Sequence, residues 1–199
     1  MHRLDAGDIR FEGRSLRRLA PHRIARLGIG RTFQIVKPFS SMTVRENAAV
    51  GALFGSSAAR QSVRNAFLIA DETLELVGLA EKRLAPVSSL TVPDRKRLEV
   101  ARALCTRPRL LLLDEVMAGL NAVEADVSLE MVHRVHASGV TIVLIEHVMR
   151  VIVEVCPRVV VLHLGRLLAE GRPRDVLSDP RVVEAYLGER YARRHLTER

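Results

Sequence analysis

The chain has 199 residues, of which 48% are hydrophobic, and this content excludes a disordered protein and allows one good-sized core. Its formal net charge is +8, but the basic residues are almost all Arg, are spread along the chain and have no aromatic stacking platform beside them. This distribution argues against a nucleic-acid partner. No apolar run reaches the roughly 18 residues of a membrane-spanning helix, so we expect any membrane association to depend on partner proteins.

The first residues predict short extended segments followed by a helical turn. Ile9 and Phe11 alternate with polar residues, which is typical of a short strand and turn, and Pro21 is a favourable first residue for a helix. Residues 30–36 then predict a strand that ends near the polar Gln34.

Residues 38–104 predict a mostly helical subdomain. Thr43 with Glu46 three positions later forms a capping-box pattern that opens a helix, and a second helical pattern runs over residues 58–76. The capping pattern recurs at Thr91 and Asp94, which predicts a helix that ends at residue 104.

Residues 105–171 predict the main part of a parallel sheet. The apolar runs at 110–113 and 140–145 show no alternation, as expected for strands that are covered on both faces. Residues 122–137 carry apolar positions at helical spacing between these runs, which predicts a strand-helix-strand crossover with parallel strands. The fold class is therefore α/β.

The remaining elements predict a smaller C-terminal part. We expect a helix over residues 147–155, then a hairpin whose two strands are joined by Gly165 and Arg166. Residues 172–199 predict two short helices and a basic tail. We take residues 1–199 as a single domain with the helical subdomain inserted.

Polar residues end each predicted strand of the sheet. Asp114 and Glu115 close one apolar run, His147 follows the next, and Gln34 ends the strand near the N-terminus. Taken singly, each has an ordinary reading as a polar strand end or a surface histidine. Together they predict a ligand site, because the carboxyl ends of parallel strands share one edge of a sheet.

These residues occur within segments whose order resembles ATP-binding cassette (ABC) ATPases. The segments are RTFQ at 31–34, LTVPDRKRLEVARAL at 90–104, LLLLDE at 110–115, AGLN at 118–121 and IEH at 145–147. Within that family the chain is most similar to the ATPases of branched-chain amino acid importers. The resemblance covers nearly the whole chain and implies a P-loop NTPase-like parallel sheet with a helical subdomain.

The resemblance implies ATP and Mg²⁺ as ligands and assigns a role to each site residue. The assignments are Asp114 and Gln34 as metal ligands, Glu115 as the catalytic base with Gln34 and His147 as further catalytic residues, and Thr91, Asp94 and Asn121 as nucleotide contacts. The signature-like segment departs from the family's common L-S-G-G-Q. Pro93 has no N–H to offer a phosphate, and Asp94 adds a negative charge near it, so we expect weaker nucleotide binding there.

None of the 12 glycines lies in a phosphate-loop pattern of the form G-x-x-x-x-G-K-[ST]. We therefore expect that the N-terminal strand and its phosphate loop are missing from the stated sequence. Such a loop supplies several charge-assisted hydrogen bonds, each worth about 1.5–3 kcal/mol, so productive ATP binding by this chain alone is not expected.

Two functional hypotheses follow from the resemblance. The first is the ATP-hydrolysing subunit of an importer for branched-chain amino acids, with urea or short amides as alternative solutes. Its implied partners are a second ABC ATPase subunit, identical or different, transmembrane permease subunits and, indirectly, a solute-binding protein, with the chain on the cytoplasmic face of the membrane. The second hypothesis is a non-catalytic remnant or regulatory module that docks on a permease or a partner ATPase.

Overall fold

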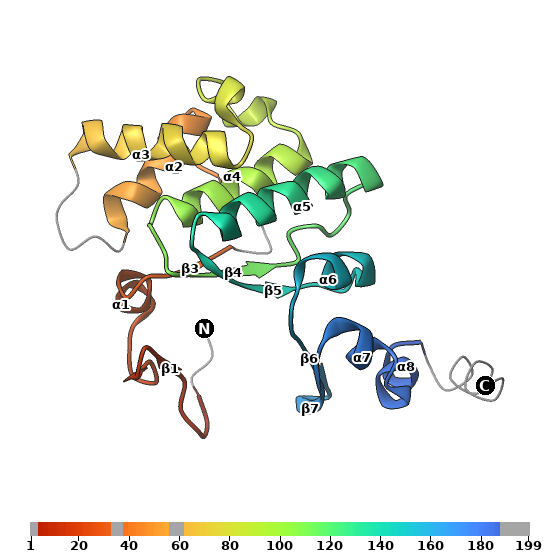
Figure 1. Cartoon of the computed structure of the whole chain (residues 1–199). Helices are drawn as coiled ribbons and strands as arrows, with labels where there is room; N and C mark the ends of the chain where they lie inside the picture. Colours follow the sequence, from red (N-terminus) through yellow and green to blue (C-terminus); the bar gives the residue numbers. More distant parts are fainter. Residues whose placement is uncertain (1–3, 33–37, 56–61, 188–199) are drawn as a thin grey trace. The chain divides into compact units, whose positions relative to one another are not determined.

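A computed structural model describes residues 4–32, 38–55 and 62–187 (Figure 1). The chain divides into two units, Met1–Ile145 and Glu146–Arg199, and each is described by itself below. The boundary between them follows the last strand of the first sheet, inside the range 105–171 that the sequence groups together.

The first unit is built on a parallel sheet in the order β3-β4-β5. Its strands are β3 (Ile29–Arg31), β4 (Leu110–Asp114) and β5 (Thr141–Ile145). Helix α5 (Ala122–Ala137) connects β4 to β5. The expected parallel crossover is therefore confirmed, and the strand predicted over 30–36 is seen at Ile29–Arg31, while residues 33–37 lie outside the described ranges.

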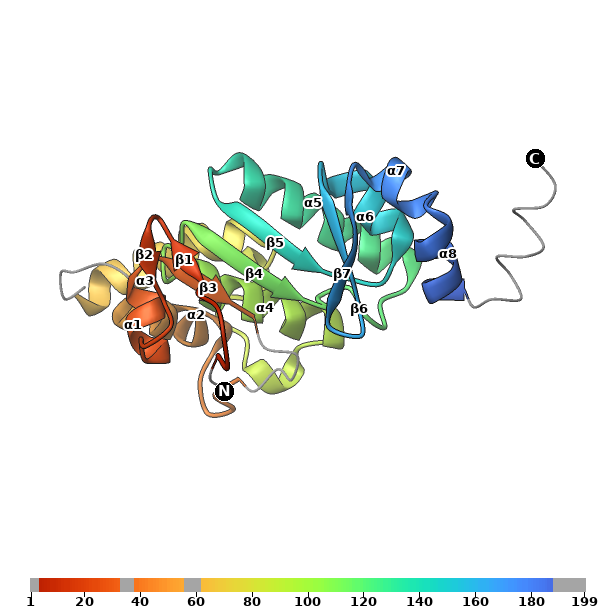
Figure 2. The same ribbon diagram turned by 90° about the horizontal axis from the view of Figure 1, so that it is seen from below.

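The longer helices of the first unit lie on one face of this sheet (Figure 1; Figure 2 shows the sheet from below). They are α2 (Val44–Phe54), α3 (Val63–Leu76), α4 (Val92–Leu104) and α5, with short 3₁₀ turns η1 (Ala80–Lys82) and η2 (Val87–Ser89) before α4. Both predicted capping boxes are present, at Thr43 with Glu46 and at Thr91 with Asp94. Local side-chain chemistry thus fixes where α2 and α4 begin.

The helical subdomain is held together by a close approach of α2 to the end of α4. A Cβ atom on Gly51 would lie 2.2 Å from the Arg102 carbonyl oxygen and 3.0 Å from the Cys105 Cβ. A side chain at position 51 cannot be accommodated at that spacing, so the glycine lets two helix backbones pack together.

A short antiparallel hairpin and a helical turn precede the sheet. They are β1 (Arg10–Phe11), β2 (Arg14–Ser15) and α1 (Pro21–Arg26). The Arg109 guanidinium lies 5.4 Å from the Phe11 ring centroid and forms an ion pair with Glu12. This contact attaches the hairpin to the residue that precedes β4.

The second unit contains a helix, a hairpin and two further helices. Its elements are α6 (Met149–Val155), β6 (Val159–His163), β7 (Arg166–Gly171), α7 (Pro173–Leu177) and α8 (Pro180–Leu187). The hairpin turns at Leu164 and Gly165, which have φ values of 47° and 76°. The expectation that Gly165 and Arg166 form the turn is wrong by one residue, because two consecutive positive φ values match a two-residue hairpin turn and Arg166 already pairs with His163. No helix within the described ranges is long and apolar enough to cross a membrane.

Candidate active site

Asp114 lies at the carboxyl end of the central strand of the three-stranded sheet. It is the last residue of β4, and its register partner is Ile145, the last residue of β5. Its side chain is 22% exposed, so the carboxylate is accessible at the edge where both strands end. This edge is where open α/β sheets bind their ligands.

Two residues at the end of β3 hold Asp114 in place. Arg31 Nη2 donates to Asp114 Oδ2 at 3.2 Å, and the Asp114 backbone N–H donates to the buried Thr32 hydroxyl at 3.2 Å. Side chain and backbone of the same aspartate are therefore fixed from the neighbouring strand. No role was predicted for either residue from the sequence, although both lie in the RTFQ segment at 31–34 that contains Gln34.

Glu115 begins the loop that follows β4. Its φ is +50°, a left-handed conformation that is uncommon for a residue with a side chain. Its N–H donates to the Ile145 carbonyl at 2.9 Å, and its own carbonyl accepts from the Ala118 N–H at 3.2 Å. Lys96 of α4 also donates to the carbonyl oxygens of Glu115 and Ala118. The loop with Glu115 is thus bonded to both β5 and α4.

Asn121 ends this loop and caps α5. Its Oδ1 accepts from the Glu124 N–H at 3.0 Å, while Glu124 Oε2 accepts from the Asn121 N–H at 3.0 Å. The residue assigned to nucleotide contact therefore also fixes the start of the crossover helix.

Thr91 caps the N-terminus of α4 in the signature-like segment. Its Oγ1 accepts from the Asp94 N–H at 3.3 Å, and Pro93 in the first turn contributes no N–H. The hydroxyl of Thr91 still has its own O–H to donate. Thr91 is exposed, so this donor is accessible to a ligand at the helix N-terminus.

Asp94 is buried, and cations of this same chain pair with its charge. Its side chain is 1% exposed, and it accepts from Lys82 Nζ and from Arg97 Nη2, both at 2.5 Å. Burial raises the pKa of Asp94, but the hydrogen bonds from Lys82 and Thr91 and the charges of Arg97 and Lys82 together hold the pKa below its ordinary value of 3.8. The carboxylate that we expected to weaken phosphate binding is therefore offset by two neighbouring cations.

Replacing Asp94 with Asn is expected to destabilise the protein by about 2 kcal/mol, because a buried charged hydrogen-bond partner of Lys82 and Arg97 is lost. The folded-state pKa of Asp94 is lowered. The carboxylate therefore contributes fully to the free energy of unfolding above the pKa of the unfolded chain, about 3.9, and this contribution is lost as the pH falls through the folded-state pKa. Urea denaturation at pH 7 and at a series of pH values that falls from 4 through the folded-state pKa measures both effects.

The exposed Glu72 on α3 provides the matched control, and Glu72→Gln should leave the unfolding free energy within about 0.5 kcal/mol of the wild type. A difference between wild type and Asp94→Asn that is as large below the folded-state pKa as at pH 7 would contradict the paired, ionised carboxylate.

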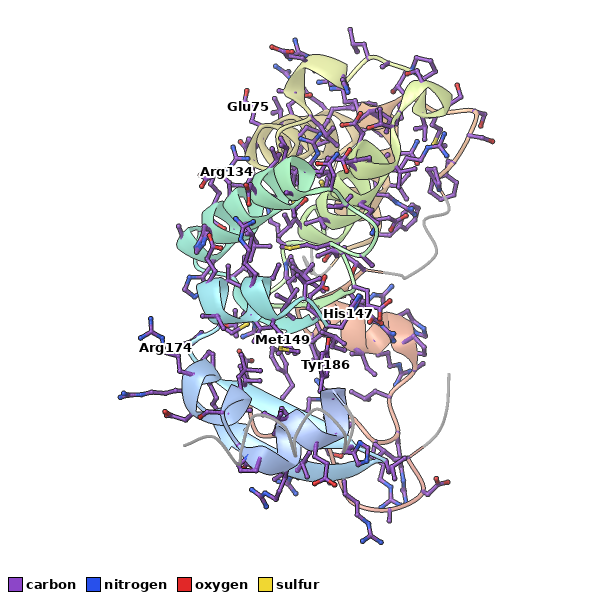
Figure 3. All side chains as sticks on the ribbon, turned by 90° about the vertical axis from the view of Figure 1, so that its right-hand side faces the viewer. Glu75, Arg134, His147, Met149, Arg174 and Tyr186 are labelled. Atoms are coloured by element: carbon purple, nitrogen blue, oxygen red, sulfur yellow. The ribbon has the colours of Figure 1, made fainter. Side chains whose placement is uncertain are left out.

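Two assigned residues are not placed beside this edge. Gln34 lies outside the described residues. His147 belongs to the second unit, where its carbonyl oxygen accepts from the Tyr186 hydroxyl of α8 at 2.5 Å (Figure 3). That bond fixes the backbone of the segment before α6. The roles of Gln34 and His147 stay predictions.

Comparison with known proteins identifies the family. Residues 1–118 match the family described as ABC transporter, and residues 166–192 match the family described as branched-chain amino acid ATP-binding cassette transporter. The chain belongs to the ABC transporter family. The resemblance inferred from the sequence motifs is thereby confirmed.

Curated relatives of this ABC transporter chain are named as branched-chain amino acid transport ATP-binding proteins. It is 38% identical over 195 residues to the high-affinity branched-chain amino acid transport ATP-binding protein BraF of Pseudomonas aeruginosa, covering 92% of this chain and 76% of BraF. It is 36% identical over 195 residues to the corresponding LivG of Escherichia coli K12, with the same two coverages. The chain thus spans about three quarters of the length of these relatives.

Solved ABC structures have the same fold. A nucleotide-free ATP-binding cassette from an ABC transporter superposes with a TM-score of 0.79 at 29% identity, over 94% of this chain and 79% of that chain. An ATP-binding cassette in its ADP conformation superposes with a TM-score of 0.76 at 30% identity, over 93% of this chain and 78% of that chain. The predicted ABC ATPase fold class is confirmed.

The partly exposed carboxylate of Asp114 is the kind of ligand that Mg²⁺ prefers. Among the described residues no group of three or more His, Cys, Asp or Glu side chains could hold a metal ion. Mg²⁺ is commonly bound by one or two carboxylates together with substrate phosphates and water. Asp114, whose partly exposed carboxylate lies at the sheet edge, would hold Mg²⁺, which would offset the negative charge of the phosphates.

Proposed function

We propose that the chain is the ATP-binding subunit of an ABC importer for branched-chain amino acids, in which ATP hydrolysis drives transport. The observation that carries this proposal is the pair Asp114 and Glu115, which ends the central β4 strand and is bonded from β3, β5 and α4. The names of the relatives and the match of residues 166–192 support the solute class.

Glu115 acts as the general base in the proposed reaction. Its carboxylate takes a proton from a water molecule, the water oxygen bonds to the γ-phosphorus of ATP, and the bond to the β–γ bridging oxygen breaks to give ADP and phosphate. The Arg31 and Thr32 contacts keep Asp114 at the sheet edge, where its carboxylate would be one ligand of the metal. By the family resemblance, Gln34 would be a second ligand of the metal or would bind the attacking water, and His147 would donate a hydrogen bond to a phosphate oxygen.

Thr91 contributes to the binding of a nucleotide that the opposite subunit holds. Its exposed hydroxyl at the N-terminus of α4 donates to the terminal phosphate, and the cation-paired Asp94 helps to fix that N-terminus without an unbalanced charge. Asn121, at the start of α5, contacts the same interface. In this arrangement two ATPase subunits face one another.

The assembly that follows from this proposal places the chain on the cytoplasmic face of the membrane. Its partners are a second ABC ATPase subunit and two transmembrane permeases, and a solute-binding protein delivers the amino acid to the permeases. The alternative, a module that docks on a permease without chemistry, predicts the same permease contact but no role for Asp114 and Glu115.

Isolation of the assembly from its own cell tests the proposal. The chain is tagged at its genomic locus, captured from detergent-solubilised membranes and analysed by intact mass for every subunit, and ATP turnover of the captured assembly is measured with and without Mg²⁺. We expect permease subunits together with Mg²⁺-dependent turnover. Permeases without turnover would favour the docking module, and an assembly without permeases would contradict an importer.

A further inference from the structure

Lys96 links the signature-like helix to the loop that carries the proposed base. It lies in the second turn of α4, and its Nζ donates to the Ala118 carbonyl oxygen and, at 3.4 Å, to the Glu115 carbonyl oxygen. The two acceptors are the first and last residues of the turn Glu115–Ala118, which the Ala118 N–H to Glu115 carbonyl bond closes. One ammonium group therefore bridges both ends of this turn.

The turn has a conformation that needs support from outside. Glu115 has a φ of +50°, which costs free energy for a residue with a Cβ. Val116 and Met117 in the turn are buried, so a change in its backbone would also disturb packing. Contacts from neighbouring elements must therefore stabilise this backbone.

The chemistry of lysine suits this position. An ammonium group has three donors and no acceptor, and its charge strengthens hydrogen bonds to carbonyl oxygens. Because Thr91 caps α4, the Lys96 side chain connects the helix that would contact one nucleotide with the loop that would act on another.

We propose that Lys96 is a positioning residue that holds the Glu115–Ala118 turn, and with it the Glu115 carboxylate, against α4. Lys96 does not contact the reacting atoms in this account; it acts through the backbone of Glu115. The inference rests on the proposed role of Glu115 as the base, and goes beyond it by naming the residue that sets the geometry of that base.

The test compares Lys96→Met, Lys96→Arg and the control Arg64→Met, which removes a cation from an exposed position on α3. Hydrogen exchange of the peptide spanning residues 113–121 is measured in the full chain within its captured assembly. Lys96→Met should accelerate exchange there by roughly 10-fold, since a charge-assisted hydrogen bond is lost, whereas peptides of α2 should be unchanged. Lys96→Arg should show a smaller change, and Arg64→Met none.

The second readout is ATP turnover by the same assemblies. Lys96→Met should lower kcat by roughly 10-fold or more and leave KM for ATP unchanged, because the geometry of the base is disturbed while nucleotide contacts remain. Lys96→Arg should restore part of the kcat. This partial rescue separates positioning from a purely structural role.

Unchanged exchange at residues 113–121 in Lys96→Met would overturn the inference and leave the proposed function intact. Faster exchange with wild-type kcat would also overturn it, because the turn would then not control catalysis. Full turnover of Glu115→Gln measured in parallel would instead contradict the proposed role of Glu115 itself, and the inference would fall with that role.

Discussion

Replacing Glu115 with Gln is expected to lower ATP turnover of the assembled transporter by at least about 100-fold, with ATP binding unchanged. The amide keeps the shape of the side chain but cannot accept the proton of the attacking water. The backbone bonds of Glu115 to Ile145, Ala118 and Lys96 do not involve the carboxylate, so the turn should keep its conformation. Steady-state phosphate release and equilibrium binding of a labelled ATP measure the two quantities separately.

The control for this variant is Glu130→Gln, which makes the same chemical change at an exposed position of α5. It should turn over ATP at the wild-type rate. Wild-type turnover by Glu115→Gln would exclude Glu115 as the base. Loss of ATP binding along with turnover would show that the carboxylate contributes to the ground state and not only to proton transfer.

Replacing Asn47 with Ala is expected to destabilise the first unit by about 3–5 kcal/mol. Asn47 is completely buried in α2, and its side-chain amide bonds the backbone of the segment before the helix. Oδ1 accepts from the Phe39 N–H at 2.8 Å, and Nδ2 donates to the carbonyl oxygens of Phe39 at 3.1 Å and Thr43 at 2.9 Å. The alanine variant leaves these backbone groups without that partner, and such groups are costly to bury.

Urea denaturation followed by circular dichroism measures this loss. Ser41→Ala changes an exposed residue of the same segment and should stay within about 0.5 kcal/mol of the wild type. An Asn47→Asp variant should also be destabilised, because a carboxylate would face the carbonyl oxygens of Phe39, Met42 and Thr43 that now accept from Nδ2. An alanine variant as stable as the wild type would mean that water replaces the amide.

Features that depend on neighbouring residues were predictable from the sequence. The capping boxes at Thr43 and Thr91 need only a hydroxyl and a carboxylate three positions apart, so both helix starts could be predicted. The apolar runs that became β4 and β5 could be assigned as parallel strands because the residues between them have helical spacing. These patterns placed Asp114 at the edge of the sheet.

Features that depend on distant residues were not predictable in this way. Arg31 and Thr32 contact Asp114 across more than 80 positions of sequence, and nothing local distinguishes Arg31 from the many other arginines of the chain. The compensation of Asp94 by Lys82 likewise appears only when η1 lies beside α4. A sequence pattern could give the charge of Asp94 but not its surroundings.

The backbone conformation of the loop after β4 could not be predicted from the sequence either. A positive φ at Glu115 has no signal in its residue type, since glutamate seldom adopts it. The lysine that bonds this loop comes from the second turn of a helix for which the sequence predicted only the cap and the last residue. Tertiary contacts decide both features.

Uptake of labelled leucine by the native cell tests the central claim most directly. The comparison is between cells with the wild-type gene, cells in which the gene is deleted, and deletion cells that carry either the wild-type chain or Glu115→Gln. We expect high-affinity leucine uptake to be lost on deletion, restored by the wild-type chain and not restored by Glu115→Gln. Undiminished leucine uptake in the deletion strain, with uptake of urea or a short amide lost in its place, would contradict a branched-chain amino acid importer.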